Sequence, residues 1–431
     1  MHLLGYFPKS SSVRPICRHL RNPESPTCRQ TPPAESPTCH HLQNPESPTC
    51  RQTPPAESPT CHHRLDAGTY PQTGALPYPA SVIQSHPRCM EALPIREVLE
   101  HLHITGRSRE RRDRIQVPCI RIARGAYLEG PYLESLDSRW KKRRAVEIAR
   151  IFAVARMRPS AIAIGRSALI IHGLDLPEPL EAELRGSIAF ARSSTSSRAP
   201  LELPAVILGV EVVAPKIEVR FTDVAHTRVR ATRKHGVRVQ SIAHATFSAA
   251  FLHPPRMAFI LACFGYRALL DLRPGERPLP ESTRSLRASA LDALAPLPTR
   301  SARRKQARKI LATADAGCES IGEAWLLWLL VEAGVRGIET QVHVEVRGTH
   351  AFIDIAIPEL GLAIEFDGRA KYGSTLEEVH RSAEAERRRE RLLVQAGWTV
   401  IRVRWSDLHR PDSVVEQILD IISARRRIAR R

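Results

Sequence analysis

Three acidic residues near the C-terminus have the types and the spacing of a metal site. Asp354 lies within one apolar run, and Glu365 and Asp367 alternate with apolar residues in the next. Carboxylate oxygens are hard ligands that suit Mg²⁺ or Mn²⁺. A divalent ion held by them can lower the pKa of a bound water and polarise a phosphate group. The pattern therefore predicts phosphodiester hydrolysis, with Asp354 and Glu365 as bridging ligands.

The chain reversal between the two apolar runs brings these acids together. If Pro-Glu-Leu-Gly at 358–361 forms a four-residue hairpin loop, Ile357 pairs with Leu362, and Asp354 then lies opposite Glu365. Opposed residues share one face of a sheet, with Cβ atoms roughly 4.5–5.5 Å apart, and opposed like charges destabilise the sheet. A cation between the two carboxylates would remove that repulsion. The alternative is a solvated polar strand face that holds no metal.

Further residues near this pair could take part in the reaction. Asp367 lies two residues along the second run and therefore shares the face of the pair. Lys371 or Arg369 could stabilise the charge that develops on the phosphate. Glu323 could add a carboxylate, although Ser320-x-x-Glu323 is also the pattern of a helix-capping box. The candidate catalytic residues are Asp354, Glu365, Asp367, Lys371 and Glu323, and the candidate metal ligands are Asp354, Glu365 and Asp367.

Periodicity predicts the elements that position these residues. An apolar helix begins at Ser320, and three strand-like runs, a long helix, a fourth strand and a last helix follow it. The predicted order is α-β-β-β-α-β-α. We expect Trp398 and Trp405 to pack in the core of this fold. The predicted bounds are 320–334, 341–347, 350–357, 362–367, 376–396, 399–404 and 411–425.

This segment, 318–431, resembles the PD-(D/E)xK nuclease superfamily, and within it the very-short-patch-repair-like (Vsr-like) endonuclease domains. The resemblance rests on SIGE (320–323), FIDIAIPE (352–359), AIEFDGRAKY (363–372) and ERRRERLLVQAGWTVIRVRWSDL (386–408). It implies a restriction-endonuclease-like core in which Asp354 and Glu365 bind the metal. The lysine of the superfamily would fall at position 367, where this chain has Asp, and relatives in the subfamily also carry an acid there. Lys371 or an arginine of 387–389 would then take the place of that lysine.

The segment 90–158 has the pattern of a small DNA-binding unit. A helix at 95–101 is followed by a basic helix, which Thr105 or Ser108 could cap, and by an alternating stretch at 119–127. This order predicts a winged helix-turn-helix, with a solvated basic helix beside a structural hairpin as the alternative. The stretch Arg-Gly-Ala-Tyr at 124–127 resembles the wing of AbiEi-type antitoxins. The candidate DNA-binding residues are Arg109, Arg111, Arg112, Arg121 and Arg124.

The segment 159–317 is predicted to be a mixed α/β region with weaker signals. We expect a strand and a helix within 160–177, strands within 205–222 and 237–242, and one or two buried helices over 249–272. His172 is interpreted as a capping or core histidine. The run at 300–309 predicts a basic helix, and the run at 139–144 predicts a solvated helix face.

The first 89 residues read as a disordered tail. They hold 16 of the 34 prolines and a 22-residue tandem repeat, 19–40 and 41–62, whose copies differ at one position. Such a segment buries too little apolar surface to offset its ordering entropy. The Cys and His residues of the repeat lack zinc-site spacing. Met90 is an alternative start of translation, because the composition becomes globular there.

Charge and hydropathy bound the remaining function classes. The 431 residues carry 64 Lys and Arg against 45 Asp and Glu, a net charge of +19, and +17 of it falls between 90 and 317. A basic region of this kind favours a polyanionic partner. No apolar run is long enough to span a membrane. Cys119, Cys263 and Cys318 are scattered, which is typical of buried thiols in a reducing cytoplasm.

Together these patterns predict a multidomain α/β protein that acts as a Mg²⁺-dependent (or Mn²⁺-dependent) DNA endonuclease in the cytoplasm. The basic region would bind DNA, and the C-terminal domain would cleave it. The alternative is a non-catalytic DNA-binding transcriptional regulator of the antitoxin type, with a toxin-like or DNA-modification partner. A nuclease directed at RNA is a third interpretation.

Overall fold

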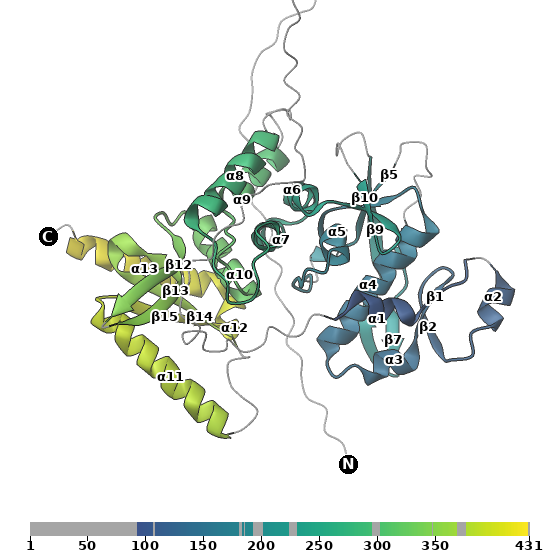
Figure 1. Ribbon diagram of the computed structural model, residues 1–431, viewed down its shortest axis with the longest axis horizontal. Helices are drawn as coiled ribbons and strands as arrows, with labels where there is room; N and C mark the ends of the chain where they lie inside the picture. The colour runs from purple at the N-terminus through teal and green to yellow at the C-terminus, as the bar shows by residue number, and fades with distance from the viewer. Residues whose placement is uncertain are drawn as a thin grey trace, which may run out of the picture. The chain divides into compact units, whose positions relative to one another are not determined.

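The chain divides into two units, Met1–Ala75 and Leu76–Arg431, and every described residue lies in the second. The predicted disordered tail 1–89 and Lys371 lie outside the described residues. None of the helices in the described part combines the length and apolar character needed to cross a bilayer. The computed structural model (Figure 1) describes residues 93–106, 108–180, 183–184, 186–192, 201–223, 231–294, 302–346, 348–368 and 376–429.

The first described elements form a three-stranded sheet with short helices. The sheet has the order β1-β3-β2, and the long helix α4 packs against its strands. Strand β1 stands between α1 and α2, because Leu102 and Ile104 alternate with His103 and pair with β3. The elements are α1 (Ile95–Glu100), β1 (Leu102–Ile104), α2 (Arg109–Asp113), β2 (Cys119–Ala123), β3 (Ala126–Glu129), α3 (Gly130–Ser135) and α4 (Arg139–Met157).

The central region is built on a six-stranded mixed sheet of order β10-β11-β4-β5-β9-β6, beside a two-stranded hairpin, β7-β8. The predicted strands and the predicted helix near 165 are present, whereas β5, β6 and β10 were not predicted. The elements are β4 (Ile162–Ala163), α5 (Gly165–Ile171), β5 (Ala189–Arg192), β6 (Leu201–Leu203), β7 (Val206–Leu208), β8 (Glu211–Ala214), β9 (Ile217–Asp223), β10 (Ala231–Lys234) and β11 (Val237–Gln240).

Four helices connect the central sheet to the C-terminal elements. The region 249–272 contains parts of two helices, and the predicted basic helix is α9, whereas α8 was not predicted. His172 is the C-cap residue of α5, and its Nε2 atom lies 2.7 Å from the carbonyl oxygen of Gln240, which confirms its structural interpretation. The helices are α6 (Ile242–Leu252), α7 (Pro255–Leu269), α8 (Pro280–Leu294) and α9 (Ala302–Thr313).

The C-terminal elements follow the predicted order, with two short helices, η4 and α12, added. A four-stranded sheet of order β12-β13-β14-β15 has antiparallel pairs except for β14 and β15, which are parallel. The elements are α10 (Ile321–Glu332), β12 (Glu339–Val346), β13 (Thr349–Ile357), the 3₁₀ helix η4 (Pro358–Leu360), β14 (Leu362–Asp367), α11 (Leu376–Gln395), β15 (Thr399–Arg404), α12 (Trp405–Leu408) and α13 (Pro411–Ala429).

Helices cover both faces of the C-terminal sheet (Figure 1). On one face, Ile364 and Phe366 join an apolar core with residues of α7, α10 and α13. On the other face, Ala363 packs with Leu393 of α11. The rings of Trp398 and Trp405 contribute to these cores, as predicted. A separate core, from Leu93 to Leu261, is shared by residues of α1, α3, α4 and the central sheet.

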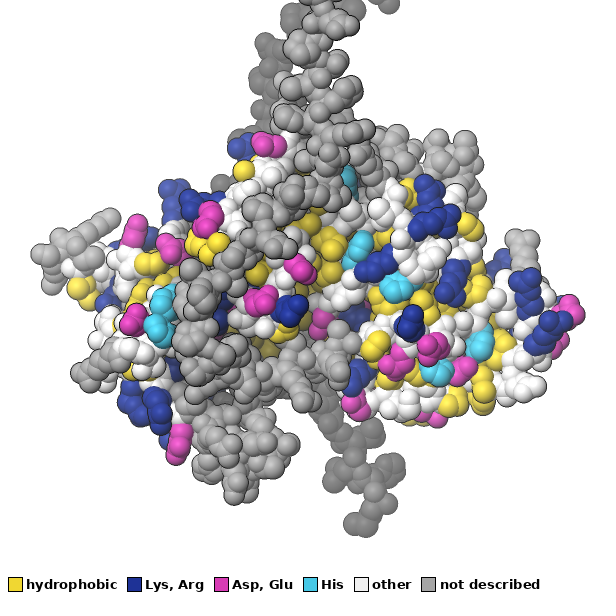
Figure 2. All heavy atoms as spheres, in the orientation of Figure 1, with side chains coloured by type: hydrophobic (Ala, Val, Ile, Leu, Met, Phe, Trp, Pro, Cys, Tyr) yellow, Lys and Arg dark blue, Asp and Glu magenta, His cyan; other side chains and the backbone are white. Residues whose placement is uncertain are grey.

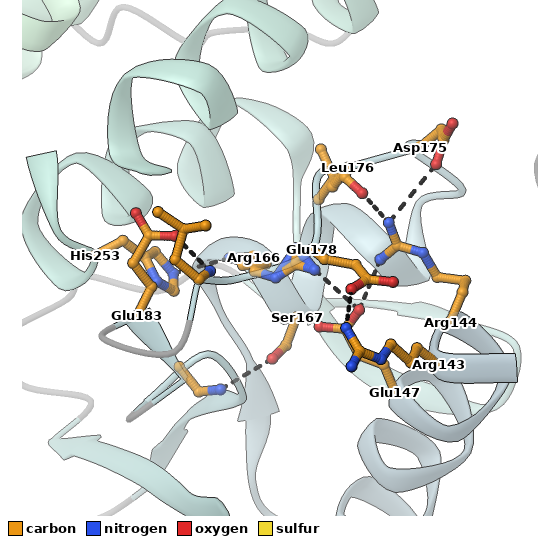
Figure 3. A network of polar contacts seen from close by, with 12 residues as sticks. Arg143, Arg144, Glu147, Arg166, Ser167, Asp175, Leu176, Glu178, Glu183 and His253 are labelled. Atoms are coloured by element: carbon orange, nitrogen blue, oxygen red, sulfur yellow. Dashed lines mark hydrogen bonds and ion pairs between the residues drawn. The ribbon is translucent and has the colours of Figure 1, made fainter. Parts of the chain in front are cut away.

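A buried ion network joins α4 to α5 in the central region (Figure 3). One oxygen of Glu147 lies 2.7 Å from Arg144 Nη1 and 2.9 Å from Arg166 Nη2. Arg166 is fully buried, and burial lowers the pKa of its guanidinium to about 10 although Glu147 opposes the shift. The prediction of a solvated helix face at 139–144 is therefore wrong for Arg144, whose side chain is 6% exposed. Cys263 and Cys318 are buried free thiols, as predicted, and Cys119 is half-buried.

Candidate functional site

The hairpin between β13 and β14 has the register that the sequence predicted. Ile357 pairs with Leu362, and the ladder continues to Ile355 and Ile364. Gly361, at the end of the loop, has a φ of 56°, which a glycine adopts without strain. The backbone ladder ends before Asp354.

Asp354 joins the two strands through its side chain instead. The backbone N–H of Phe366 donates to its Oδ2 atom over 3.0 Å. The carboxylate thus takes the place of a strand carbonyl at the point where backbone pairing of β13 with β14 stops. This contact fixes the position of Asp354 at the end of the ladder rather than in a regular cross-strand pair with Glu365.

A kink in β12 accompanies this change. Thr340 pairs with Ile355 and Val342 with Ile353, so that Gln341 falls opposite Asp354 without a ladder partner. Gln341 has a φ of 52°, which is uncommon for a residue with a side chain and marks local strain. Across this point the core-facing side of β13 changes.

That change is visible in the packing of two residues of β13. Ile353 packs with the α11 side of the sheet, whereas Ile355, two residues on, packs with the α10 side. Regular alternation would place both on one face. The break falls at Asp354. Its carboxylate therefore lies between the face of the sheet that α10 covers and the face that α11 covers.

Glu365 points to the face that α11 covers. Its side chain is 1% exposed and forms an ion pair of 2.8 Å with Nη2 of Arg389. The same guanidinium donates to the carbonyl oxygen of Phe352. Burial lowers the pKa of Arg389, but the charges of Glu365 and Asp354 outweigh that effect and leave the pKa raised. One arginine therefore interacts with both of the predicted bridging ligands, Glu365 and Asp354.

Glu323 approaches the same site from α10. Ser320 caps the helix by accepting from the N–H of Glu323 over 3.1 Å, and the Glu323 carboxylate accepts from the N–H of Glu319 over 2.7 Å. The capping interpretation is thus correct in kind. Burial, followed by the negative charge of Asp354, raises the pKa of Glu323 to about 8. Glu323 is both a capping residue and a neighbour of Asp354.

Gly322 sets how closely α10 approaches β14. A Cβ atom at this position would lie 2.0 Å from the ring of Phe366. Only a residue without a side chain permits this contact. The glycine before Glu323 therefore allows the helix to bring that carboxylate to the strand end.

Asp367, the last residue of β14, has a different environment. Its carboxylate lies 3.8 Å from Nε of Arg404, its partner in β15, and its side chain is 10% exposed. Asp367 therefore belongs to the same strand face as Glu365 but has its own cation. Lys371, the remaining candidate, is outside the part of the chain that is described.

The carboxylates of Asp354, Glu365 and Glu323 are donors that suit a divalent cation, but the site already contains a positive charge on Arg389. Among the described residues, no three His, Cys, Asp or Glu side chains are grouped closely enough to hold a metal ion. Mg²⁺ commonly uses only one or two protein carboxylates and keeps several waters. Asp354 with Glu323 or Glu365 supplies that number, and the pKa of Glu323 is raised first by burial and then by the negative charge of Asp354. The residues fit such an ion if Arg389 gives up part of its contact with Glu365.

The candidate DNA-binding arginines lie on an exposed basic arm, which we define as residues 108–114 with strand β2 and the β2–β3 turn. Figure 2 shows Lys and Arg side chains gathered over α2. Gly125, in the turn, accepts hydrogen bonds from the N–H groups of Thr105 and Gly106 over 2.9 and 3.1 Å, which ties the turn to the base of the arm. The exposed arginines are Arg109, Arg111, Arg112, Arg121 and Arg124.

The arm differs from a helix-turn-helix in one respect. Helix α2 begins at Ser108, one of the two predicted caps, but has five residues and buries none of them. Strand β1 separates α1 from α2, so the two helices do not form the consecutive pair of that motif. The hairpin that was predicted as a wing is present as β2 and β3.

Sequence reasoning missed one cation near the acidic residues. Arg277, in the connection between α7 and α8, lies beside the C-terminal sheet, with its guanidinium carbon 3.8 Å from the ring centre of Phe352. No motif marks this position, because it precedes Asp354 by a long stretch of chain.

Comparison of the chain with protein families, curated proteins and solved structures finds no match.

Proposed function

We propose that the C-terminal domain is a metal-dependent phosphodiesterase that cleaves DNA. The observation that carries the proposal is that two buried carboxylates, Glu323 of α10 and Glu365 of β14, lie near the half-buried Asp354 of β13, where the β13–β14 ladder ends. Glu365 is 1% exposed and Glu323 has a pKa raised to about 8. Buried acids at such density are costly unless a cation stabilises them.

Each residue has a distinct part in this proposal. A bound Mg²⁺ or Mn²⁺ would supply a water of lowered pKa and would polarise the phosphate. Asp354, held by the N–H of Phe366, and Glu365 are the proposed ligands. Glu323, whose pKa is raised to about 8, would exchange a proton with a bound water as an acid–base group. Asp367 and Lys371 stay secondary candidates.

DNA affinity is assigned to the basic arm. Its arginines are exposed and carry the charge in a region that is strongly basic, whereas the C-terminal segment is near neutral. Neutralising phosphates releases counterions and gives affinity without sequence readout. The cytoplasm is the compartment in which such a protein would meet DNA.

A second candidate function is a non-catalytic DNA-binding regulator of the antitoxin type. The ion pair between Glu365 and Arg389 favours it, because a guanidinium already balances one of the proposed ligands. Asp367 at the position of the superfamily lysine points the same way. In this version the C-terminal domain would only clamp nucleic acid.

The two candidates are separated by incubating the full chain with supercoiled plasmid and Mg²⁺. We expect nicking, and we expect the double variant Asp354→Ala/Glu365→Ala to lower its rate by about 1,000-fold, since metal stabilisation of charge is worth several kcal/mol. Asp420→Ala, an exposed acid on α13, serves as the matched control. Binding without nicking at any Mg²⁺ or Mn²⁺ concentration would instead favour the regulator. A structured RNA in place of plasmid tests the third interpretation.

The assignment of the arm is tested by binding at several salt concentrations. Each phosphate contact contributes about 0.9 to the slope of log K against log salt. Arg109→Ala/Arg111→Ala should therefore lower the slope by about two, whereas Arg284→Ala, an exposed arginine of α8, should leave it unchanged. An unaltered slope in the double variant would remove the arm from the DNA interface.

A further inference from the structure

Arg277 reaches the acidic site from outside the C-terminal segment. Its Nε atom donates to Oε1 of Gln341 over 2.9 Å, and its guanidinium carbon lies 3.8 Å from the ring centre of Phe352. Gln341 is the kinked residue opposite Asp354. The guanidinium is thus fixed across β12 and β13, at the same level of the sheet as Asp354.

The connection that carries Arg277 is held in place by a second, buried arginine. Arg267 of α7 is 7% exposed and donates Nη2 to the carbonyl oxygens of Arg273 and Glu276, each over 3.1 Å. Its Nη1 donates to the carbonyl of Ala316 over 2.8 Å, just before α10. A buried side chain that bonds three carbonyls fixes the loop backbone. The position of Arg277 is therefore built into the fold.

The charges around Arg277 are those of the candidate site. Burial lowers the pKa of Arg277, and Arg389 adds to this, whereas Glu319 and Asp354 oppose it. The side chain is 26% exposed, and its Nη2 atom lies 4.0 Å from Oε1 of Glu319. Among the residues that the structure describes, Nη2 has no hydrogen-bond partner closer than this acid. Nη1 donates to the carbonyl oxygen of Gly275 over 3.0 Å, so Nη2, with its long contact to Glu319, is the donor best placed to meet a ligand.

We propose that Arg277 contacts the phosphate of the nucleic-acid strand that is cleaved at Asp354. This inference rests on the proposed function and adds a second cation to the site, because Arg389 already pairs with Glu365. Arginine suits phosphate binding better than lysine here. Its planar guanidinium stacks on an aromatic ring and presents several N–H donors in one plane. Arg389 pairs with Glu365 at 2.8 Å, whereas Nη2 of Arg277 lies 4.0 Å from Glu319 and can shift towards a phosphate.

The test compares Arg277→Ala and Arg277→Lys with the control Arg284→Ala in the full chain. Under single-turnover conditions with Mg²⁺, Arg277→Ala should lower the cleavage rate by about 100-fold, the effect of losing one donor to a developing charge. Arg277→Lys keeps the charge and should recover part of that rate. Arg284→Ala should stay within about twofold, as for a surface residue. Thermal unfolding of each variant shows whether the loop is still folded.

Duplex binding with Ca²⁺ in place of Mg²⁺ gives a readout that does not depend on cleavage. Arg277→Ala should lower the salt slope by about 0.9, the value of one phosphate contact. If Asp354→Ala abolishes nicking while Arg277→Ala cleaves and binds like the wild type, the role of Arg277 is overturned and the proposed function stands. If Asp354→Ala still nicks, the proposed function fails. If the wild type never nicks, an unchanged slope in Arg277→Ala overturns the phosphate contact as well.

Discussion

Arg389 of α11 and Glu365 of β14 form an ion pair with 2.8 Å between Nη2 and Oε2, on the buried face of the C-terminal sheet. The pair links the long helix to the strand that carries two of the candidate ligands. It also places a cation beside Asp354. The same contact therefore bears on stability and on metal binding.

Removing Arg389 alone should destabilise the protein. In Arg389→Met, the carboxylate of Glu365, whose side chain is 1% exposed, loses its ion pair with Arg389, and breaking a buried pair costs about 3–5 kcal/mol. Adding Glu365→Gln removes the uncompensated charge and should restore part of the loss. Urea unfolding of the four members of this cycle measures the coupling. Arg388→Met, at the neighbouring exposed arginine, should change stability by less than about 0.5 kcal/mol.

Additive effects of the two single changes would contradict the pairing. In that case Arg389 and Glu365 would contribute independently to the free energy of unfolding.

Metal binding tests the same pair of residues in a second way. Arg389→Met should bind Mn²⁺ more tightly than the wild type. In the variant, Glu365 does not have to give up its ion pair with Arg389 before it can bind the metal.

Glu323 should make stability depend on pH. Its pKa is raised from 4.5 to about 8, so between these values the folded chain holds a proton that the unfolded chain has lost. Stability is then fully present below pH 4.5 and falls as pH rises towards 8, by up to about 1.4 kcal/mol per pH unit. Glu323→Gln cannot lose this proton. The difference in unfolding free energy between variant and wild type should grow in favour of the variant from pH 5 to pH 8, and a constant difference would contradict the account.

Gly322→Ala tests the close approach of α10 to β14. The new Cβ atom would lie 2.0 Å from the ring of Phe366, and overpacking of this kind costs about 1–3 kcal/mol. Phe366→Leu in the same chain makes room and should reduce the penalty, so the two changes should be less than additive. Guanidinium unfolding of the single and double variants measures this. Full additivity would show that helix and ring do not meet.

Glu147→Gln tests the buried network of Figure 3. It leaves Arg144 and Arg166, 6% and 0% exposed, without their shared carboxylate, and should cost about 3–5 kcal/mol. Glu178 pairs with Arg143 in the same network, but both are about a third exposed. Glu178→Gln should therefore cost less than about 1 kcal/mol, the usual value of a surface pair. Equal losses in the two variants, measured by thermal unfolding, would contradict the burial argument.

The C-terminal elements were predictable because their periodicity is strong and local. The register of β13 with β14 followed from a loop of four residues, and Ile357 does pair with Leu362. The pairing of Asp354 was not predictable in the same way. Its hydrogen bond to Phe366 depends on a kink at Gln341, which no local pattern marks.

Tertiary contacts account for the other differences. The basic run at 139–144 has the composition of a solvated face, yet Arg144 is buried because Glu147 and the distant Arg166 form a network with it. Arg277 reaches the site from a connection between helices, and its contacts with Gln341 and Phe352 join parts of the chain that are far apart in sequence. The segment between α1 and α2 forms the short strand β1 instead of the turn of a helix-turn-helix, because Leu102 and Ile104 pair with residues of β3.

The central claim is that Asp354 and its neighbouring carboxylates hold a divalent cation. Calorimetric titration of Mn²⁺ into the full chain, for the wild type, Asp354→Asn and the exposed control Asp420→Asn, tests it most directly. The account predicts saturable binding by the wild type and by Asp420→Asn, and loss of that binding in Asp354→Asn with the fold intact by circular dichroism. Equal Mn²⁺ binding by Asp354→Asn and the wild type would contradict it.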